Sequence, residues 1–172
     1  MARLPIRLYG DPVLRAKARQ VEEIDEKLHR LVEDMVETML EADGAGLAAN
    51  QVGELHRVIV VNFAAGDGAE DVKVLINPEI TRREGSMCME EGCLSLPDVN
   101  EEVKRAASAT VEYTTLEGNR TEIEAAEILS AVVQHETDHL DGILFIDRIS
   151  PVRRRLLKGV LKQIARSVKQ PV

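Results

Sequence analysis

The chain has 172 residues and a net charge of −8 at pH 7, with two Tyr, two Phe and no Trp. This length suits a single domain over residues 1–172 with an aliphatic core, and no apolar run approaches the ~20 residues of a membrane span. The N-terminus lacks a secretory apolar segment and there are only two cysteines, which disfavours a disulfide-rich secreted protein and indicates the cytoplasm.

The first predicted element is an amphipathic helix over residues 24–40, where apolar side chains recur at helical spacing before a stop signal at Gly44. Strand-like runs follow at residues 57–63, 72–77, 108–116 and 119–124. Glu117-Gly118 separates the last two runs and indicates a hairpin. Helices near both ends with antiparallel strands between them predict an α+β fold.

The loop after the first helix reads Gly44-Ala45-Gly46-Leu47-Ala48-Ala49-Asn50-Gln51. Its glycines and small residues let the backbone bend sharply and let another chain come close. Gln51 could donate a side-chain N–H to a developing oxyanion. A phosphate loop is disfavoured because no Gly-Lys-Ser/Thr follows. As structure alone, the same residues fit a helix C-cap at Gly44 that leads into a buried loop.

A candidate thiolate ligand lies in the segment Glu91-Gly92-Cys93-Leu94-Ser95-Leu96-Pro97. Cys93 follows a glycine and precedes a short apolar stretch, which suits a thiolate on a strand beside a close backbone approach. In an extended segment the α-carbons of Cys88 and Cys93 would be roughly 16 Å apart, so a disulfide requires a turn between them. Cys88, between Met87 and Met89, better fits a small apolar filler.

The most informative segment is Gln134-His135-Glu136-Thr137-Asp138-His139-Leu140. Residues four apart lie one turn apart on a helix, so His135 and His139 can bind one metal ion. Glu136 projects beside that ion, where it can take a proton from a metal-bound water. The structural alternative is two core histidines that are hydrogen-bonded to backbone carbonyls.

A catalytic metal site usually has three protein ligands and one open position. The nearest acids downstream of the histidines, Asp141 and Asp147, do not follow the extended His-x-x-Gly-x-x-His pattern. Cys93 is therefore the better candidate for the third ligand.

Residues 150–172 predict a basic amphipathic C-terminal helix, because they contain seven Lys or Arg residues and no acid. An apolar stripe at helical spacing runs through Leu156, Leu157, Val160, Leu161, Ile164 and Ala165. The simpler interpretation is a terminal helix packed on the domain with its basic face in water.

Together these segments resemble the peptide deformylase family. The family carries Gly-x-Gly-Leu-Ala-Ala-x-Gln, Glu-Gly-Cys-Leu-Ser and Gln-His-Glu-x-Asp-His-Leu in this order, and the three motifs match Gly44–Gln51, Glu91–Ser95 and Gln134–Leu140. The similarity extends to Asp11–Arg15 and Ile76–Pro78, so that it covers nearly the whole chain.

The resemblance implies a central helix that binds one metal ion through Cys93, His135 and His139, with antiparallel strands packed around it. It implies Fe(II) as the metal, with Zn, Ni or Co as substitutes, although the ligand types alone would have suggested zinc. It implies no particular oligomer and no membrane association.

The implied reaction removes the N-formyl group from formyl-methionyl nascent peptides and releases formate. Glu136 would accept a proton from the attacking water and deliver it to the leaving amine. The metal, the Gln51 side chain and the Leu94 backbone N–H would stabilise the oxyanion. Some relatives are reported to contact the ribosome, so the basic C-terminal helix is a candidate for contact with ribosomal RNA.

The resemblance also implies a substrate-binding set, which comprises Gly44, Ala45, Gly46, Glu91, Gly92, Ile128, Ala131 and Val132. The Gly46 backbone and its neighbours would pair with the substrate main chain as a strand does. Ile128, Ala131 and Val132 would line an apolar pocket for the methionine side chain. By the same resemblance Glu91 is expected to pair with Arg105 and to brace the cysteine segment, and the alternative is that both side chains are solvated.

Four positions depart from the family pattern: Ala45 replaces a branched apolar residue, Asn100 an arginine, Glu127 a glycine and Ser130 an alanine. These departures affect substrate preference more than activity, because none of them removes a ligand, the glutamate or an oxyanion donor.

Two other functions remain open. One is a zinc endopeptidase of the His-Glu-x-x-His type, and the other is a non-catalytic metal- or peptide-binding module. The binding module is disfavoured because it would need neither Glu136 nor Gln51.

Overall fold

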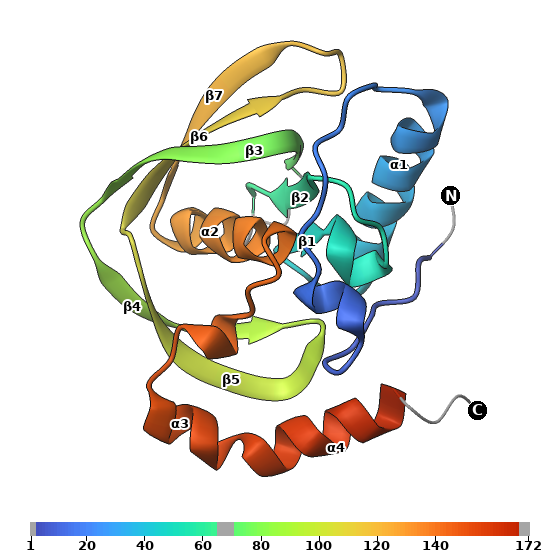
Figure 1. The fold of residues 1–172 in the computed structure, drawn as a ribbon. Coiled ribbons are helices and arrows are strands. Elements are labelled where there is room, and N and C mark those ends of the chain that lie inside the picture. The colour runs from blue at the N-terminus through green and yellow to red at the C-terminus, as the bar shows by residue number, and fades with distance from the viewer. Residues whose placement is uncertain (1–2, 65–70, 169–172) are drawn as a thin grey trace.

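The computed structural model describes residues 3–64 and 71–168. Its helices are α1 (Glu26–Glu41), α2 (Ile128–Leu140), α3 (Pro151–Leu156) and α4 (Lys158–Val168), shown in Figure 1. Single turns of 3-10 helix occur at Pro12–Arg15, Ala49–Val52 and Phe145–Asp147. Within the described ranges, none of the helices is long and apolar enough to cross a bilayer.

Two antiparallel sheets enclose α2 (Figure 1). The larger sheet has the strand order β1-β2-β3-β6-β7, with β1 (Gly46–Ala48), β2 (Val58–Asn62), β3 (Val72–Glu84), β6 (Ser108–Thr114) and β7 (Arg120–Ala126). The smaller sheet pairs β4 (Met87–Cys93) with β5 (Leu96–Arg105). Because α2 contacts strands of both sheets, its side chains are held between two layers. This is the α+β arrangement around a central helix that the sequence predicts.

Helix α1 forms where the sequence predicts it. The Asp25 side chain caps it by accepting a hydrogen bond from the Leu28 N–H at 2.9 Å. Its buried face, which includes Leu28, Met35 and Met39, packs in one apolar cluster with β2 residues. The helix ends at Glu41, and the Gly44 N–H bonds to the free Met39 carbonyl at 2.9 Å. The chain then enters β1, which lies at an edge of the larger sheet.

Strand β3 is longer than the predicted run of 72–77. Asn77-Pro78 has the composition of a turn, but the strand passes through it and continues to Glu84, with register shifts between Ile76 and Glu79 and between Ile80 and Arg82. Asn77 adopts a φ of 50° there, and its side chain exchanges hydrogen bonds of 2.8 and 2.9 Å with the Val21 backbone. Proline has no N–H to donate to the neighbouring strand, and the bulge accommodates this gap in the hydrogen bonding. The strand therefore continues through a turn-like sequence, which is why the predicted run ended too early.

The predicted hairpin at Glu117-Gly118 joins β6 to β7. Gly118 has a φ of 84°, and its N–H bonds to the Thr115 carbonyl at 3.0 Å. A glycine adopts this left-handed backbone without the steric penalty that other residues meet.

The predicted C-terminal helix is two helices with a break at Leu157. Leu161 and Ile164 of α4 are buried in a cluster with β5 residues, as the apolar stripe predicts. Leu156, in contrast, is 74% exposed, so its assignment to the packed face is wrong. The break turns α3 so that this side chain points to solvent. The predicted residues 169–172 lie outside the described part of the chain.

Candidate metal centre and active site

Three side chains from distant parts of the chain converge between the sheets. The Cys93 sulfur lies 3.4 Å from His139 Nε2, which lies 3.2 Å from His135 Nε2. One potential ligand atom from each residue falls within 4.8 Å of the other two. One thiolate and two imidazoles form a donor set that suits a divalent transition metal. In the described residues, this is the one such group of three His, Cys, Asp or Glu side chains.

The acids downstream of the histidines have other partners. Asp141 pairs with Arg57 at 2.8 Å, and Asp147 pairs with Arg15 and Arg154. Neither is part of the cluster of Cys93 with the two histidines.

Helix α2 holds the two histidines one turn apart and almost fully buried, with exposures of 8% for His135 and 1% for His139. Gly142 ends the helix: its N–H bonds to the His139 carbonyl at 3.0 Å, and its φ is 72°. A Cβ at this position would lie 2.5 Å from the Arg15 carbonyl oxygen. The helix begins after Glu127, which adopts a φ of 53° and a ψ of −123°. Glycine tolerates this backbone conformation far better than glutamate does.

Cys93 lies at the end of β4, next to a bulge after Glu91, and pairs with Leu96 across a tight turn. Cys88 and Cys93 are both free thiols, so the disulfide alternative is wrong. The prediction that Cys88 is an apolar filler is also wrong, because this side chain is exposed. Cys88 and Glu90 share the outer face of β4, whereas Glu91 and Cys93 point inward.

A network of ion pairs lies behind the histidines. Arg105 Nε and Nη2 donate to the two oxygens of Glu91 at 2.7 and 2.9 Å, which confirms the predicted pair. Glu91 Oε2 lies 2.9 Å from His135 Nδ1. Asp138 accepts hydrogen bonds of 2.5 Å from Arg105 and from Arg148. With Nδ1 held by a carboxylate, His135 directs Nε2 toward Cys93 and His139.

The pKa values in this network follow from burial and partners. Burial raises the pKa of Glu91, but the hydrogen bonds from Arg105 and His135 lower it more, to about 2. Burial lowers the pKa of His135, but its contacts with Cys93 and Glu91 raise it well above the usual value. Burial and the neighbouring His135 hold the pKa of His139 well below its usual value. Because a metal binds neutral imidazole, metal binding should release a proton from this pair.

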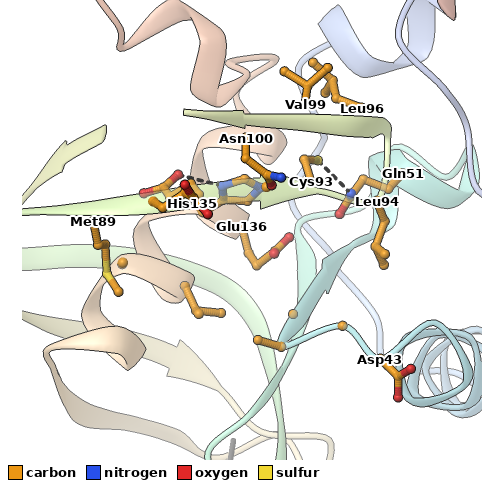
Figure 2. A pocket seen from close by; sticks show the side chains of 18 of the residues that line it. Asp43, Gln51, Met89, Cys93, Leu94, Leu96, Val99, Asn100, His135 and Glu136 are labelled. Atoms are coloured by element: carbon orange, nitrogen blue, oxygen red, sulfur yellow. Dashed lines mark hydrogen bonds and ion pairs between the residues drawn. The ribbon is translucent and has the colours of Figure 1, made fainter. Parts of the chain in front are cut away.

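Glu136 lies on the cavity side of α2 (Figure 2). A Cβ added at Gly46 would lie 2.7 Å from Glu136 Cγ, so the loop passes directly over this carboxylate. Within residues 3–64 and 71–168, Glu136 Oε2 is buried and has no hydrogen-bond partner. Burial raises the pKa of Glu136 to about 7. This carboxylate can therefore gain or lose a proton near neutral pH.

Gln51 approaches the cluster from the turn after β1. Its Nε2 lies 3.5 Å from the Cys93 sulfur (Figure 2). The same Nε2 lies 3.2 Å from Ser95 Oγ. Its Oε1 accepts a hydrogen bond from the Ala48 N–H at 2.9 Å, which fixes the orientation of the amide. Ser95 is fully buried. The sequence did not indicate this contact, although Ser95 belongs to the Glu91–Ser95 motif.

These groups border a cavity of about 500 Å³ (Figure 2). It is lined by the predicted residues Gly44, Ala45, Gly46, Gln51, Glu91, Gly92, Cys93, Leu94, Ile128, Ala131, Val132, His135 and Glu136. Of the predicted site residues only His139 is absent from the lining. Ile128 is 55% exposed, which puts it toward the mouth. Met89 and Val99 also line the cavity, and no sequence pattern indicated them because neither falls in a motif.

Two of the four departures from the family pattern lie in this region with clear contacts. Ser130 is fully buried, and its hydroxyl donates to the Ala106 carbonyl at 2.9 Å and accepts from Gln134. Asn100 lines the cavity, and its Oδ1 lies 2.5 Å from where a Cβ on Gly92 would be. Any side chain at Gly92 would therefore displace Asn100.

The chain is similar to known proteins over nearly its whole length. A model of the family described as Polypeptide deformylase matches residues 3–155. Peptide deformylases of Acidobacterium capsulatum and Syntrophobacter fumaroxidans are 47% and 49% identical to this chain, each over 95% of it and 96% of the relative.

Solved structures give the same result. The crystal structure of peptide deformylase from Thermus thermophilus superposes with a TM-score of 0.90 at 45% identity, covering 96% of this chain and 99% of that one. A peptide deformylase from Legionella pneumophila gives a TM-score of 0.88 at 37% identity, covering 99% and 100%. These likenesses confirm the predicted α+β fold and the predicted resemblance.

Proposed function

The chain belongs to the polypeptide deformylase family and is a peptide deformylase, and we propose that it removes the formyl group from formyl-methionyl nascent peptides. The proposed reaction depends on a metal and releases formate. The observation that carries this proposal is the convergence of Cys93, His135 and His139 beside the buried Glu136 on one cavity wall.

Cys93, His135 and His139 would hold one divalent ion, which when bound supplies Lewis acidity to the hydrolysis. The mixed thiolate and imidazole set supports a soft or borderline metal such as Fe(II), Zn, Ni or Co. The choice of Fe(II) rests on the family resemblance. Glu91 holds Nδ1 of His135, so we assign it a positioning role behind the ligands. Its predicted contact with substrate stays a prediction, because Glu91 also lines the cavity.

Glu136 is the proposed general base and acid. It takes a proton from the attacking water and delivers it to the amine that leaves the formyl carbon. Two features support this role: the unpartnered oxygen in the described structure and a pKa raised by burial to about 7. A group with a pKa near the working pH can act in both directions.

The Gln51 side chain and the Leu94 backbone N–H are the proposed donors to the oxyanion. Support for Gln51 comes from its amide N–H, which is aimed at Cys93, and from the Ala48 hydrogen bond that fixes it. Leu94 directly follows the cysteine at the turn between β4 and β5.

The substrate main chain would add to the free side of β1, which pairs with β2 on its other side. Gly44, Ala45 and Gly46 lead into that edge, where small residues leave room for a second chain. The methionine side chain would occupy the apolar part of the cavity between Ala131, Val132 and Met89, with Ile128 at its mouth.

The ribosome is a proposed partner through α3 and α4. Arg153 pairs with Glu101 at 2.8 Å, and Arg154 pairs with Asp147 at 3.0 Å. Arg155, Lys158 and Lys162 are exposed and form no ion pair in the described structure. These three cations could bind RNA phosphates. Ribosome co-sedimentation should fall when residues 153–172 are deleted, and unchanged co-sedimentation would contradict this proposal.

Formate release from formyl-Met-Ala-Ser by the anaerobically purified protein tests the main proposal. We expect formate in equal amounts to the new α-amino group, and none from acetyl-Met-Ala-Ser. A zinc endopeptidase would instead cleave an internal bond in a longer blocked peptide. Cys93→Ala should abolish both metal content and formate release, whereas metal retained by this variant would favour a downstream ligand.

A further inference from the structure

A second cavity, of about 380 Å³, lies on the opposite side of the ion-pair network from the active-site cavity. It is formed by the end of β3, the turn into β4, the end of β5 and one face of α2. Its charged and hydroxyl-bearing lining consists of Arg83, Ser86, Lys104, Arg105, Asp138 and Arg148.

The charge of this lining is strongly positive although the chain has a net charge of −8. Four cations face one carboxylate, Asp138, which is already shared by Arg105 and Arg148. Arg83 and Lys104 are exposed and have no ion-pair partner in the described residues. Glu91 also neutralises Arg105 from its other side, so the charges left without a counter-ion are those of Arg83 and Lys104. Neighbouring like charges are unfavourable unless a counter-ion binds between them.

Arg105 gives this cavity a buried donor. Its side chain is only 3% exposed, with Nε and Nη2 bonded to Glu91 and Nη1 to Asp138. A guanidinium has five N–H groups, so these three bonds leave two of them for another acceptor. The Ser86 hydroxyl also has no hydrogen bond to the described part of the chain, which adds a neutral donor at the turn.

We propose that this cavity is a binding site for a tetrahedral oxyanion, either inorganic phosphate or the phosphoryl group of a small metabolite. Guanidinium groups match the oxygens of a phosphoryl group with paired N–H donors, and the lysine adds a point charge. The volume exceeds that of one phosphate and falls within the range of sites for small organic ligands, roughly 300–1,000 Å³.

Occupancy of this site would reach the metal ligands through one side chain. Arg105 contacts the proposed anion on one side and Glu91 on the other, and Glu91 orients His135. An anion that attracts Arg105 would weaken its hold on Glu91. Metal binding at the histidines would then change the affinity of this site for the anion. The anion would change the affinity of the metal site by the same factor.

The test is calorimetric titration of inorganic phosphate, pyrophosphate and AMP into the metal-loaded protein at constant ionic strength. The test variant is Arg83→Ala/Lys104→Ala, whose side chains are exposed and unpaired, so the fold should persist. The matched control is Arg155→Ala/Lys158→Ala, which removes the same charge from α3 and α4. Circular dichroism and thermal unfolding check that both variants are folded.

We expect saturable binding to the wild type, at least about tenfold weaker binding to the Arg83/Lys104 variant, and unchanged binding to the control. Tighter binding of AMP than of phosphate would identify an organic ligand carrying the group. Phosphate should also change the rate at which a chelator removes the metal from the wild type, but not from the Arg83/Lys104 variant. Absence of binding, or equal binding by wild type and that variant, would overturn the proposal. None of these readouts depends on deformylation.

Discussion

Glu91 on β4 and Glu136 on α2 line the same cavity, but their surroundings act on the same chemical group in opposite ways. Arg105 and His135 satisfy both oxygens of Glu91, and its pKa falls to about 2. Glu136 has a buried oxygen without a partner in the described chain, and its pKa rises to about 7.

The contrast shows that burial alone does not decide the state of a carboxylate. Both residues are buried, but only Glu91 has hydrogen-bond donors that favour the charged form. Carboxylates whose pKa values are driven apart by their surroundings commonly have different tasks in one site. Glu91 is suited to hold a histidine, and Glu136 is suited to exchange protons.

Among variants that keep all three metal ligands, the most severe effect on activity is expected for Glu136→Gln. This variant keeps the shape of the side chain but cannot accept a proton, so kcat/KM should fall by about 10²–10⁴-fold. Formate release measured on metal-loaded protein tests it, with the exposed Glu124→Gln on β7 as a control. Activity within a factor of about three of the wild type would exclude Glu136 as the base.

The largest effect on stability should come from Arg105→Ala. Removal of this guanidinium leaves Glu91 and Asp138 without their buried partner, which should cost about 3–5 kcal/mol in the free energy of unfolding. Urea denaturation of the metal-free protein measures this loss. Arg148→Ala is the comparison, because its side chain is 40% exposed and should cost less. Equal losses would contradict the central role of Arg105.

Gln51→Ala should lower kcat by about 10²–10³-fold if the amide donates to the oxyanion. Ser95→Ala separates this effect from a structural one, because it removes the hydrogen-bond partner of Gln51 and keeps the amide. The expectation is a small effect of Ser95→Ala on kcat. If both variants lose the same activity, Gln51 acts only by packing.

The two carboxylates should also give opposite pH dependence of stability in the metal-free protein. The pKa of Glu91 falls on folding from 4.5 to about 2, so its contribution, about 3 kcal/mol, is present above pH 4.5 and lost as the pH falls toward 2. The pKa of Glu136 rises from 4.5 to about 7, so its cost is absent below pH 4.5 and complete above pH 7.

Urea denaturation from pH 2 to pH 8 tests both signs. Glu136→Gln should be more stable than the wild type at pH 8 and equal to it at pH 4. Glu91→Gln should be less stable than the wild type at pH 6, and the difference should narrow toward pH 2. A Glu136→Gln variant without a gain at pH 8 would mean that the carboxylate finds a partner in solution.

The smallest effect concerns the residue before α2. Glu127→Gly should raise the free energy of unfolding by about 1 kcal/mol, because strain at a φ of 53° exceeds the entropy cost of glycine. Gly118→Ala makes the opposite change, because it adds a Cβ at a residue with a φ of 84°. Nothing lies within 4 Å of that Cβ, so only the backbone conformation is tested. This substitution should destabilise the protein by a similar amount. A loss of stability in Glu127→Gly would show that the glutamate is not strained.

The sequence predicted α1 and α2 well because each has a strong local pattern, amphipathic in one case and a metal motif in the other. It predicted the pair of Glu91 and Arg105 only through family resemblance. No pattern predicted β5 as a strand, because its turn-forming start and many charges hide the alternation of buried and exposed residues. Asp138 and Arg148 were missed as parts of the network because their contacts are tertiary: Asp138 meets Arg105 only when β5 packs against α2, and it meets Arg148 only when the chain turns back after α2.

The short length of β1 has a consequence for how long a bound peptide stays. A hydrogen bond contributes only about 0.5–1.5 kcal/mol, and an edge of three residues, Gly46–Ala48, can offer few of them to an incoming chain. Such an edge binds an added chain weakly and does not select among the side chains that follow the first residue. Under the proposed function, a bound peptide would therefore dissociate rapidly, and two copies of the protein would have little free backbone along which to pair.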